Sequence, residues 1–410
     1  MFRLLFVNLN FSRFVLGRFF TLCADQILLF AIPLIVYRNT GSITQSGIVF
    51  FLEWLPRVIS LPVSGILADR FGGRLLSIIS DFMRGISCLV VALLLTIHNE
   101  YSFYILSALA IVSSFFQAQS LIAIESLVPN IFGSSKLIQV QSLLQAIIQL
   151  SMIAGPIVCA SMLLIIDKNG LLFLASCIYI VCFLNTIFLQ FDNPVYDKEH
   201  GVSFIKKIQL SVSLIFNQHK LRYLTLESMA VNLLFGVLMG QASIISISAF
   251  NVTDQEFSLV QLSLGIATIS ALSFSGKVFE KWEGVNICMT SIILIFSGCI
   301  VVALSKSFSV FIFGYAVMMA ALSFFNVYMR AERVKLIPEG DRGKVISVMV
   351  MLNQIPLPLS GILISLYAES LGPQNLLLTS VLSISILNIL LFSLYRSKRK
   401  LKIKEYTNQN

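Results

Sequence analysis

The sequence contains few charged residues: only 12% of its 410 residues are Asp, Glu, Lys or Arg. A soluble protein of this size carries about twice that fraction, which excludes a soluble fold. Hydrophobic residues make up 57% of the chain, and the mean hydropathy is +0.88. Apolar runs of roughly 20 residues, the length that a helix needs to cross a bilayer, recur along the whole chain. An integral membrane protein is therefore predicted.

Patterns of catalytic and metal-binding residues are also missing. The three histidines all fall in expected loops, and the seven cysteines include no C-x-x-C pair. No G-x-x-x-x-G-K-[ST] loop occurs, which excludes a single-chain pump driven by ATP. We therefore expect no enzyme activity, no cofactor and no metal site.

The apolar runs are too long and too unalternating for barrel strands, and a bilayer otherwise admits only helices. The prediction is an all-α membrane protein with twelve transmembrane helices in two six-helix halves. The expected spans are residues 12–37, 45–67, 75–97, 101–127, 136–164, 170–191, 221–249, 256–277, 284–304, 308–330, 343–368 and 374–396.

The longest polar interruption divides these helices six and six, and part of it, residues 202–216, has the apolar spacing of a helix on the membrane surface. Most of the 29 Lys and Arg residues fall on one side of the predicted spans, which indicates that both termini are cytoplasmic. This bias explains the net charge of +9 without nucleic acid, and the basic tail is also suited to anionic lipid headgroups. The predicted parts are an N-terminal half (1–191), a cytoplasmic linker (192–220), a C-terminal half (221–397) and a basic tail (398–410).

A short motif, "GILADRFGGRLL" at residues 65–76, supports an internal repeat. Its classes of glycine, acid, base, aromatic and glycine recur 211 residues later. Pro129 is likewise matched by Pro338. The five matched positions are Gly65, Asp69, Arg70, Phe71 and Gly73, followed by Gly276, Glu280, Lys281, Trp282 and Gly284.

The motif at 65–76 closely resembles the signature loop between the second and third helices of the major facilitator superfamily. The segments "LPRVISLPVSGILADR" and "SDFMRG" resemble the branch with macrolide and other drug exporters and enterobactin-type siderophore exporters. The resemblance implies a monomeric secondary transporter of the cytoplasmic (inner) membrane whose halves rock around a central cavity. It implies export of a small amphipathic organic molecule, a siderophore or drug, in exchange for protons.

The resemblance also implies that the first, fourth, seventh and tenth helices line the cavity. Asp25 lies near the centre of the first helix, where an ionised carboxylate costs at least about 2.5 kcal/mol. It is either a substrate contact or proton carrier, or a carboxyl bonded to a neighbouring helix. The cavity candidates are Asp25, Gln117, Asn232, Gln241 and Asn326.

Several charges form a candidate gating set. Asp81 and Arg84, one turn apart, are placed to join a charge network with Asp69. The resemblance implies that this network latches the cytoplasmic side shut, whereas charges that only fix topology are the alternative. The full gating set is Gly65, Asp69, Arg70, Gly73, Arg74, Asp81, Arg84, Glu53, Arg57, Glu125, Glu227, Arg330 and Arg333.

Spacing suggests partners for the rest of this set. Glu53 and Arg57, four residues apart, are expected to form a same-helix ion pair. Glu125 and Glu227 lie near cytoplasmic helix ends, where two interpretations stand side by side: a pairing with Arg330 or Arg333, or simple topology signals.

Two predicted helices provide evidence on whether transport is coupled to protons. In the fifth helix Gly155 and Pro156 fall on positions of the superfamily's antiporter motif, where small residues permit close contact and proline permits a bend. The fourth helix departs from the drug/proton antiporter pattern, because "SSFFQAQSLIA" has no arginine. Asp25 is then the first candidate for proton coupling.

Two rival functions remain open. "LGRFFTLCADQ" and "LIPEGDRGK" resemble metal-ion exporters of the ferroportin type, in which Asp25 would be a metal ligand. Uptake of a ferric siderophore is the other, because alternating access is reversible.

Overall fold

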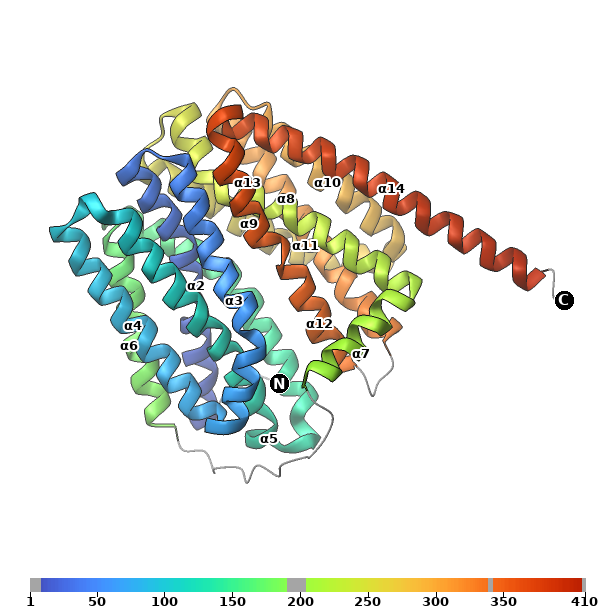
Figure 1. Ribbon diagram of the computed structural model, residues 1–410, viewed down its shortest axis with the longest axis horizontal. Coiled ribbons are helices and arrows are strands. Elements are labelled where there is room, and N and C mark those ends of the chain that lie inside the picture. The colour runs from blue at the N-terminus through green and yellow to red at the C-terminus, as the bar shows by residue number, and fades with distance from the viewer. Residues whose placement is uncertain (1–8, 190–203, 338–341, 408–410) are drawn as a thin grey trace. The chain divides into compact units, whose positions relative to one another are not determined.

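The computed structural model describes residues 9–189, 204–337 and 342–407, and every regular element within these ranges is a helix (Figure 1). The first elements are α2 (Leu9–Thr40), α3 (Ile43–Phe71), α4 (Gly73–Ile97), the short η1 (Asn99–Tyr101), α5 (Ser102–Leu163) and α6 (Gly170–Ile187). They are followed by α7 (Phe204–Asn217), α8 (His219–Phe250), α9 (Asp254–Lys281), α10 (Gly284–Ala303), α11 (Phe308–Leu336), α12 (Arg342–Gln354), α13 (Pro356–Leu371) and α14 (Pro373–Thr407).

Ten helical stretches in the described ranges are long and apolar enough to cross a membrane. They coincide with ten of the twelve predicted spans. The remaining two predictions correspond to α3, which contains Glu53 and Arg57, and to the second part of α5, whose apolar stretch is Leu150–Leu163.

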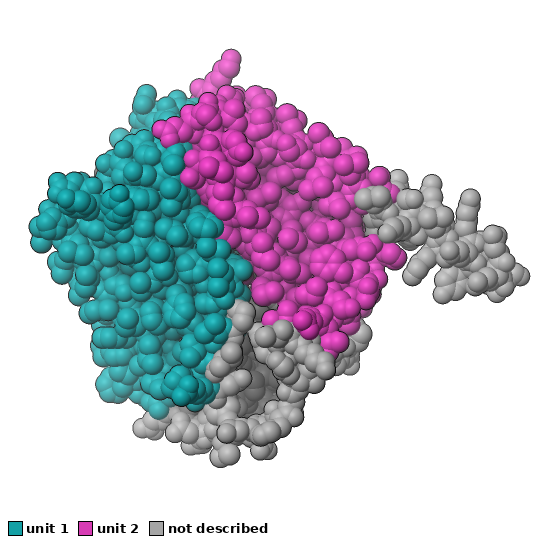
Figure 2. All heavy atoms as spheres, in the orientation of Figure 1, with its two compact units in different colours: residues 1–199, 246–266 teal, residues 200–245, 267–410 magenta. Residues whose placement is uncertain are grey.

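The chain divides into two compact units (Figure 2). Unit 1 contains residues 1–199 and 246–266, and unit 2 contains residues 200–245 and 267–410. The end of α8 and the start of α9 thus belong to unit 1, where the Arg38 guanidinium donates a hydrogen bond to the Val252 carbonyl at 2.8 Å. The predicted boundaries of the two transporter halves stay a prediction.

Two helices differ from the sequence prediction. The backbone of α5 is helical throughout 102–163, although two helices separated by a loop were expected. At about 1.5 Å per residue a straight helix of this length would far exceed a bilayer, so its two apolar stretches remain separate candidate spans. Conversely, the expected helix at 343–368 is divided into α12 and α13 at Pro356, which has no N–H to donate to the Leu352 carbonyl; the Ile355 N–H donates to that carbonyl instead, at 3.2 Å.

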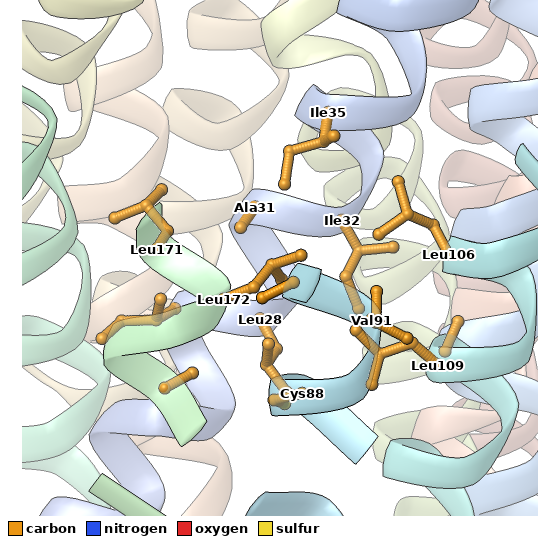
Figure 3. Close-up of a cluster of buried hydrophobic side chains, with 14 of the residues drawn as sticks. Leu28, Ala31, Ile32, Ile35, Cys88, Val91, Leu106, Leu109, Leu171 and Leu172 are labelled. Atoms are coloured by element: carbon orange, nitrogen blue, oxygen red, sulfur yellow. The ribbon is translucent and has the colours of Figure 1, made fainter. Parts of the chain in front are cut away.

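The core of unit 1 is an apolar cluster formed by α2, α4, α5 and α6 (Figure 3). Ile32 and Ile35 of α2 pack among leucines of α5 and α6, and Ala24 and Ala31 are completely buried on the same helix. Small residues on α2 allow its backbone to come close to its neighbours. This packing fixes α2 in place and therefore the polar groups that it carries.

Unit 2 brings α10 and α11 into close contact through two glycines. A Cβ atom added at Gly298 would lie 2.8 Å from the Gly314 carbonyl oxygen and 2.9 Å from the Met318 nitrogen. Close backbone approach of this kind is common between transmembrane helices.

The linker of unit 2 also forms a helix. The predicted helix at 202–216 is observed as α7, and Ile215 packs in an apolar cluster with Val345 and Met349 of α12. Its place on a membrane surface stays a prediction.

Candidate functional site

The signature motif forms the turn between α3 and α4. Gly72 has a φ of +78°, a conformation that glycine adopts without steric cost, and its N–H donates to the Ala68 carbonyl at 3.0 Å. α4 begins at the next residue, Gly73, which is buried. The residue that makes the tight turn possible is therefore Gly72, which precedes the glycine singled out in the motif.

The charged residues of this motif make different contacts. Arg70 is exposed and lies over the Phe71 ring, 5.3 Å from its centroid. Arg74 donates a hydrogen bond to the Ile187 carbonyl at 2.8 Å, which connects the turn to the end of α6. Gly65 and the Asp69 side chain lie outside the described residues, so the predicted link from Asp69 to Asp81 and Arg84 stays a prediction.

Arg84 on α4 is the centre of a buried charged cluster in unit 1. Its Nη1 lies 2.5 Å from Asp25 Oδ1 on α2, and its Nη2 lies 2.5 Å from Asp81 Oδ1 on its own helix. The Tyr179 hydroxyl on α6 donates to the same Asp25 oxygen at 2.6 Å, and the guanidinium stands over the Tyr179 ring. We call these four residues the Arg84 cluster; it joins α2, α4 and α6.

The Arg84 cluster is almost fully withdrawn from solvent. Arg84 and Tyr179 have no exposed surface, and both carboxyl groups are buried. Burying an ion costs several kcal/mol, which close pairing and additional hydrogen bonds must offset. Arg18, also buried, is close enough to Asp25 and Asp81 to act as a second cation. The two carboxylates are thus balanced by two cations. Asp25 is bonded to residues of neighbouring helices, which was the alternative to a substrate contact or proton carrier.

A second polar group lies between α3 and α5. The Arg57 Nη1 donates to Gln117 Oε1 at 3.3 Å, and its guanidinium lies over the Trp54 ring. Glu53 is buried and forms no ion pair with any described residue. The predicted same-helix pair of Glu53 and Arg57 is therefore wrong, because the guanidinium packs on the Trp54 ring of its own helix and reaches the Gln117 amide of α5 instead.

In unit 2, a buried carboxyl has only uncharged hydrogen-bond partners. Glu227 on α8 has no exposed surface and accepts a hydrogen bond from the Asn388 amide on α14. The Tyr223 hydroxyl, one turn earlier on α8, also hydrogen-bonds to this carboxyl group. The predicted partners were Arg330 and Arg333, so this pairing is wrong for Glu227: an amide within reach satisfies the carboxyl.

The cationic end of α11 is arranged differently from the prediction. The Arg333 Nε donates to the Met329 carbonyl on its own helix at 3.2 Å. Glu332 bridges Lys220 at 2.7 Å and Lys335 at 3.2 Å. Arg330 is half-buried on the same helix, and the Glu125 side chain lies outside the described residues.

Two of the remaining cavity candidates form hydrogen bonds within unit 2. The Asn232 amide donates to the Asn353 carbonyl at 2.8 Å, across to the end of α12. The Gln241 amide donates to the Val237 carbonyl on its own helix at 3.1 Å, and the side chain is completely buried. Asn326 is half-buried on α11. Whether any of them, or Gln117, meets a substrate stays a prediction.

The antiporter-like part of α5 approaches α2 closely. A Cβ atom added at Gly155 would lie 2.4 Å from Gln26 Cβ and 3.4 Å from the Cys23 carbonyl oxygen. The expected small-residue contact is therefore present at Gly155. The Pro156 side chain lies outside the described residues.

The structure adds residues that the sequence analysis did not identify. Tyr179 and Asn388 each hydrogen-bond to a carboxyl on the first long helix of their unit, and they lie 209 residues apart, the same offset as Pro129 and Pro338. Arg18 also belongs here, since it donates to Ser120 of α5 at 2.9 Å. The offset of 209 residues was the signal in the sequence from which Tyr179 and Asn388 could have been identified as a matched pair.

The sequence is similar to those of characterised efflux proteins. It is 20% identical over 381 residues to macrolide efflux protein A of Streptococcus pyogenes, which covers 91% of this chain and 93% of that protein. It is 28% identical over 136 residues to the multidrug efflux pump Tap of Mycolicibacterium fortuitum. That second alignment covers 32% of this chain and 33% of the pump, so it spans about a third of the pump's length.

Solved transporters share the fold. The nucleoside transporter NupG superposes with a TM-score of 0.73 at 14% identity, covering 95% of this chain and 99% of that one. A bacterial homologue of the iron transporter ferroportin in an inward-facing state gives 0.71 at 16% identity, covering 94% and 98%. The family model of the Major Facilitator Superfamily matches residues 14–360, so the chain belongs to this superfamily and is an integral membrane transporter of small molecules, not an enzyme.

Proposed function

We propose that this transporter exports a small amphipathic organic molecule of the drug type across the cytoplasmic membrane, with both termini in the cytoplasm. The observation that carries the proposal is the alignment with macrolide efflux protein A, which extends over 91% of the chain and is therefore not limited to one shared motif. The partial match to a multidrug pump points to the same direction of transport and substrate class. A siderophore is the second substrate class, since it shares the amphipathic chemistry.

Transport proceeds by alternating access of two six-helix halves, residues 1–191 and 221–397. The Arg84 cluster supports movement of the first half as one body, because a single guanidinium connects α2 to Asp81 and Tyr179 on α4 and α6. Breaking these bonds would leave buried charges unpaired, which is costly at membrane depth. Substrate contacts are assigned to Gln117, Asn232, Gln241 and Asn326. Asp25 is the fifth residue of this set, and Arg84 holds its carboxyl group in position.

The gate is assigned to the cytoplasmic turn between α3 and α4. Gly72 allows the helices to reverse tightly, and Arg74 fastens the turn to the end of α6. Asp69 completes the latch that closes the cytoplasmic side. Asp69→Asn is therefore expected to leave the protein folded and to abolish transport.

Drug export is tested in a macrolide-sensitive bacterium that lacks its own efflux pumps. Cells with the wild-type protein should accumulate less radiolabelled erythromycin than cells with an equal amount of the Asp69→Asn variant, and a protonophore should remove the difference. Equal accumulation in all strains would contradict macrolide export.

The alternatives are separated by two further measurements. Mass spectrometry of cytosol and medium from iron-starved cells, with and without the gene, detects export of an iron chelator. Binding of Co²⁺ or Fe²⁺ to the purified protein would instead favour a metal exporter. Import of a labelled ferric siderophore would show that transport runs inward and not outward.

A further inference from the structure

The carboxyl group of Glu227 is buried in unit 2 without a cation bound to it among the described residues. It lies in the first third of α8, has no exposed surface, and accepts a hydrogen bond from the Asn388 amide. Its other oxygen, Oε2, is buried and has no hydrogen-bond partner among the described residues. A carboxylate in this setting would retain both its charge and an unsatisfied oxygen.

The groups near Glu227 in the described part of unit 2 come from α8, α10, α11 and α14. Tyr223 is on its own helix, and Asn388 is on α14. The Cys288 thiol on α10 lies near both Glu227 and Glu332 of α11, and Tyr328 of α11 lies close to Tyr223. Glu332 is neutralised by Lys220 and Lys335. None of the groups that contact the Glu227 carboxyl in the described part of unit 2 is positively charged.

These neighbours suit a neutral carboxylic acid. An isolated ionised carboxylate is very unfavourable in an apolar interior, whereas the acid costs no more than another polar group. Amide and hydroxyl partners remain compatible with either form, because they bind the oxygen that does not carry the proton. The group can therefore change charge without the loss of an ion pair, in contrast to Asp25 with Arg84.

We propose that Glu227 carries the coupling proton of this transporter, an assignment that rests on the proposed export function. A proton from the external side binds Oε2 and forms an O–H bond, and the acid is then buried as in this structure. When the site becomes hydrated from the cytoplasmic side, the O–H bond breaks, the proton passes to water and the carboxylate remains until the site faces outward again. No oxidant, metal or second reactant is needed.

Infrared spectroscopy tests the proton site without any substrate. Purified protein in lipid is titrated with base, and difference spectra are recorded for the wild type, Glu227→Gln and Glu100→Gln. Glu100 is exposed on the short helix η1 and provides the matched control. The difference between the wild-type and Glu227→Gln spectra should contain a carbonyl band of a protonated carboxylic acid that disappears on titration, and the Glu100→Gln spectrum should keep this band. The same band in Glu227→Gln would overturn the assignment.

Proteoliposomes test the coupling. With erythromycin as the probe, Glu227→Gln should lose transport driven by a pH gradient but retain exchange of labelled for unlabelled erythromycin, which needs no net proton movement. Glutamine keeps the oxygen that accepts from Asn388, so the variant should fold. Loss of both activities would make Glu227 structural and overturn the proposal. If the wild type moves no erythromycin, macrolide export fails, and the infrared result alone decides the proton site.

Discussion

The two units each hold a buried carboxyl on their first long helix, but they stabilise it in different ways. In unit 1 Asp25 is bound by the Arg84 guanidinium and the Tyr179 hydroxyl. In unit 2 Glu227 is bound by an amide, from Asn388, and by the Tyr223 hydroxyl. The helices that supply Tyr179 and Asn388 occupy matching places in the repeat, since these residues are 209 positions apart.

The difference indicates a division of roles within one repeated architecture. A carboxylate held by a guanidinium contributes rigidity, because any movement that separates the charges leaves them buried and unpaired. A carboxyl held only by neutral groups contributes little rigidity, but its charge can change. We therefore expect substitutions in the Arg84 cluster to affect folding and those at Glu227 to affect coupling.

The largest effect is expected from Arg84→Met. It leaves Asp25 and Asp81 buried without their guanidinium, which should lower the free energy of unfolding by about 3–5 kcal/mol. The measurement is thermal unfolding of the detergent-purified protein, with Arg70→Met as the exposed control. Adding Asp25→Asn and Asp81→Asn to Arg84→Met should recover much of the loss. If Arg84→Met melts like Arg70→Met, the cluster does not hold unit 1 together.

The second prediction compares two tyrosines directly. Tyr179→Phe removes a hydrogen bond to an ionised carboxylate and should cost about 1.5–3 kcal/mol, whereas Tyr223→Phe removes one to a neutral acid and should cost about 0.5–1.5 kcal/mol. Both are measured by thermal unfolding at neutral pH, beside the exposed Tyr104→Phe. Equal losses for the two tyrosines would show that Asp25 and Glu227 have the same charge.

A third prediction contrasts glycines of the two units. Gly298→Ala in unit 2 places a Cβ against backbone atoms of Gly314 and Met318, which cannot move separately from α11, and should cost about 1–3 kcal/mol. Gly17→Ala in unit 1 meets only the end of the Asn185 side chain, at 2.7 Å, which can turn away. Thermal unfolding should therefore separate the two variants, and an equal effect would mean that α10 and α11 can move apart.

Much of the fold could be predicted because the bilayer leaves few alternatives. Apolar runs of sufficient length must be helices, and the predicted all-α fold of the Major Facilitator Superfamily is confirmed. The break at Pro356 could also have been predicted, because proline has no N–H and cannot continue the hydrogen bonds of a helix. The continuous helical backbone of α5 could not be predicted, since the polar stretch between its two apolar parts resembles a loop.

Partner choice was less predictable than fold. The spacing of Glu53 and Arg57 describes neighbours on one isolated helix, but Trp54 and Gln117 compete for the same guanidinium. Asp25 and Arg84 are 59 residues apart, so no local pattern joins them. Two buried charges of opposite sign in one six-helix half were nevertheless a signal, because each needs a partner at membrane depth.

The smallest predicted effect concerns the start of α9, outside the apolar span. The Thr253 N–H donates to Glu256 Oε2 at 2.7 Å, and the Glu256 N–H donates to the Thr253 hydroxyl at 3.2 Å, which is a capping box. The bonds from Thr253 lower the pKa of Glu256, so the stabilisation exists above the ordinary glutamate range and is lost as the pH falls through the lowered pKa. Glu256 therefore stabilises the helix in its charged form, whereas Glu227 is proposed to be buried in its protonated form, so experiments can distinguish the two groups.

The measurement for this cap is hydrogen exchange of the amides in the first turn of α9. Thr253→Ala should speed their exchange at neutral pH by the loss of about 1 kcal/mol of helix stability. Glu256→Gln should remove the pH dependence of exchange while leaving erythromycin transport unchanged, because Glu256 is exposed and distant in sequence from both buried carboxyls. An unaltered pH dependence in Glu256→Gln would assign it to another group. Two independent titrations then test the contrast between Glu256, a surface carboxylate that stabilises a helix end by its charge, and Glu227, which is buried with only uncharged partners among the described residues.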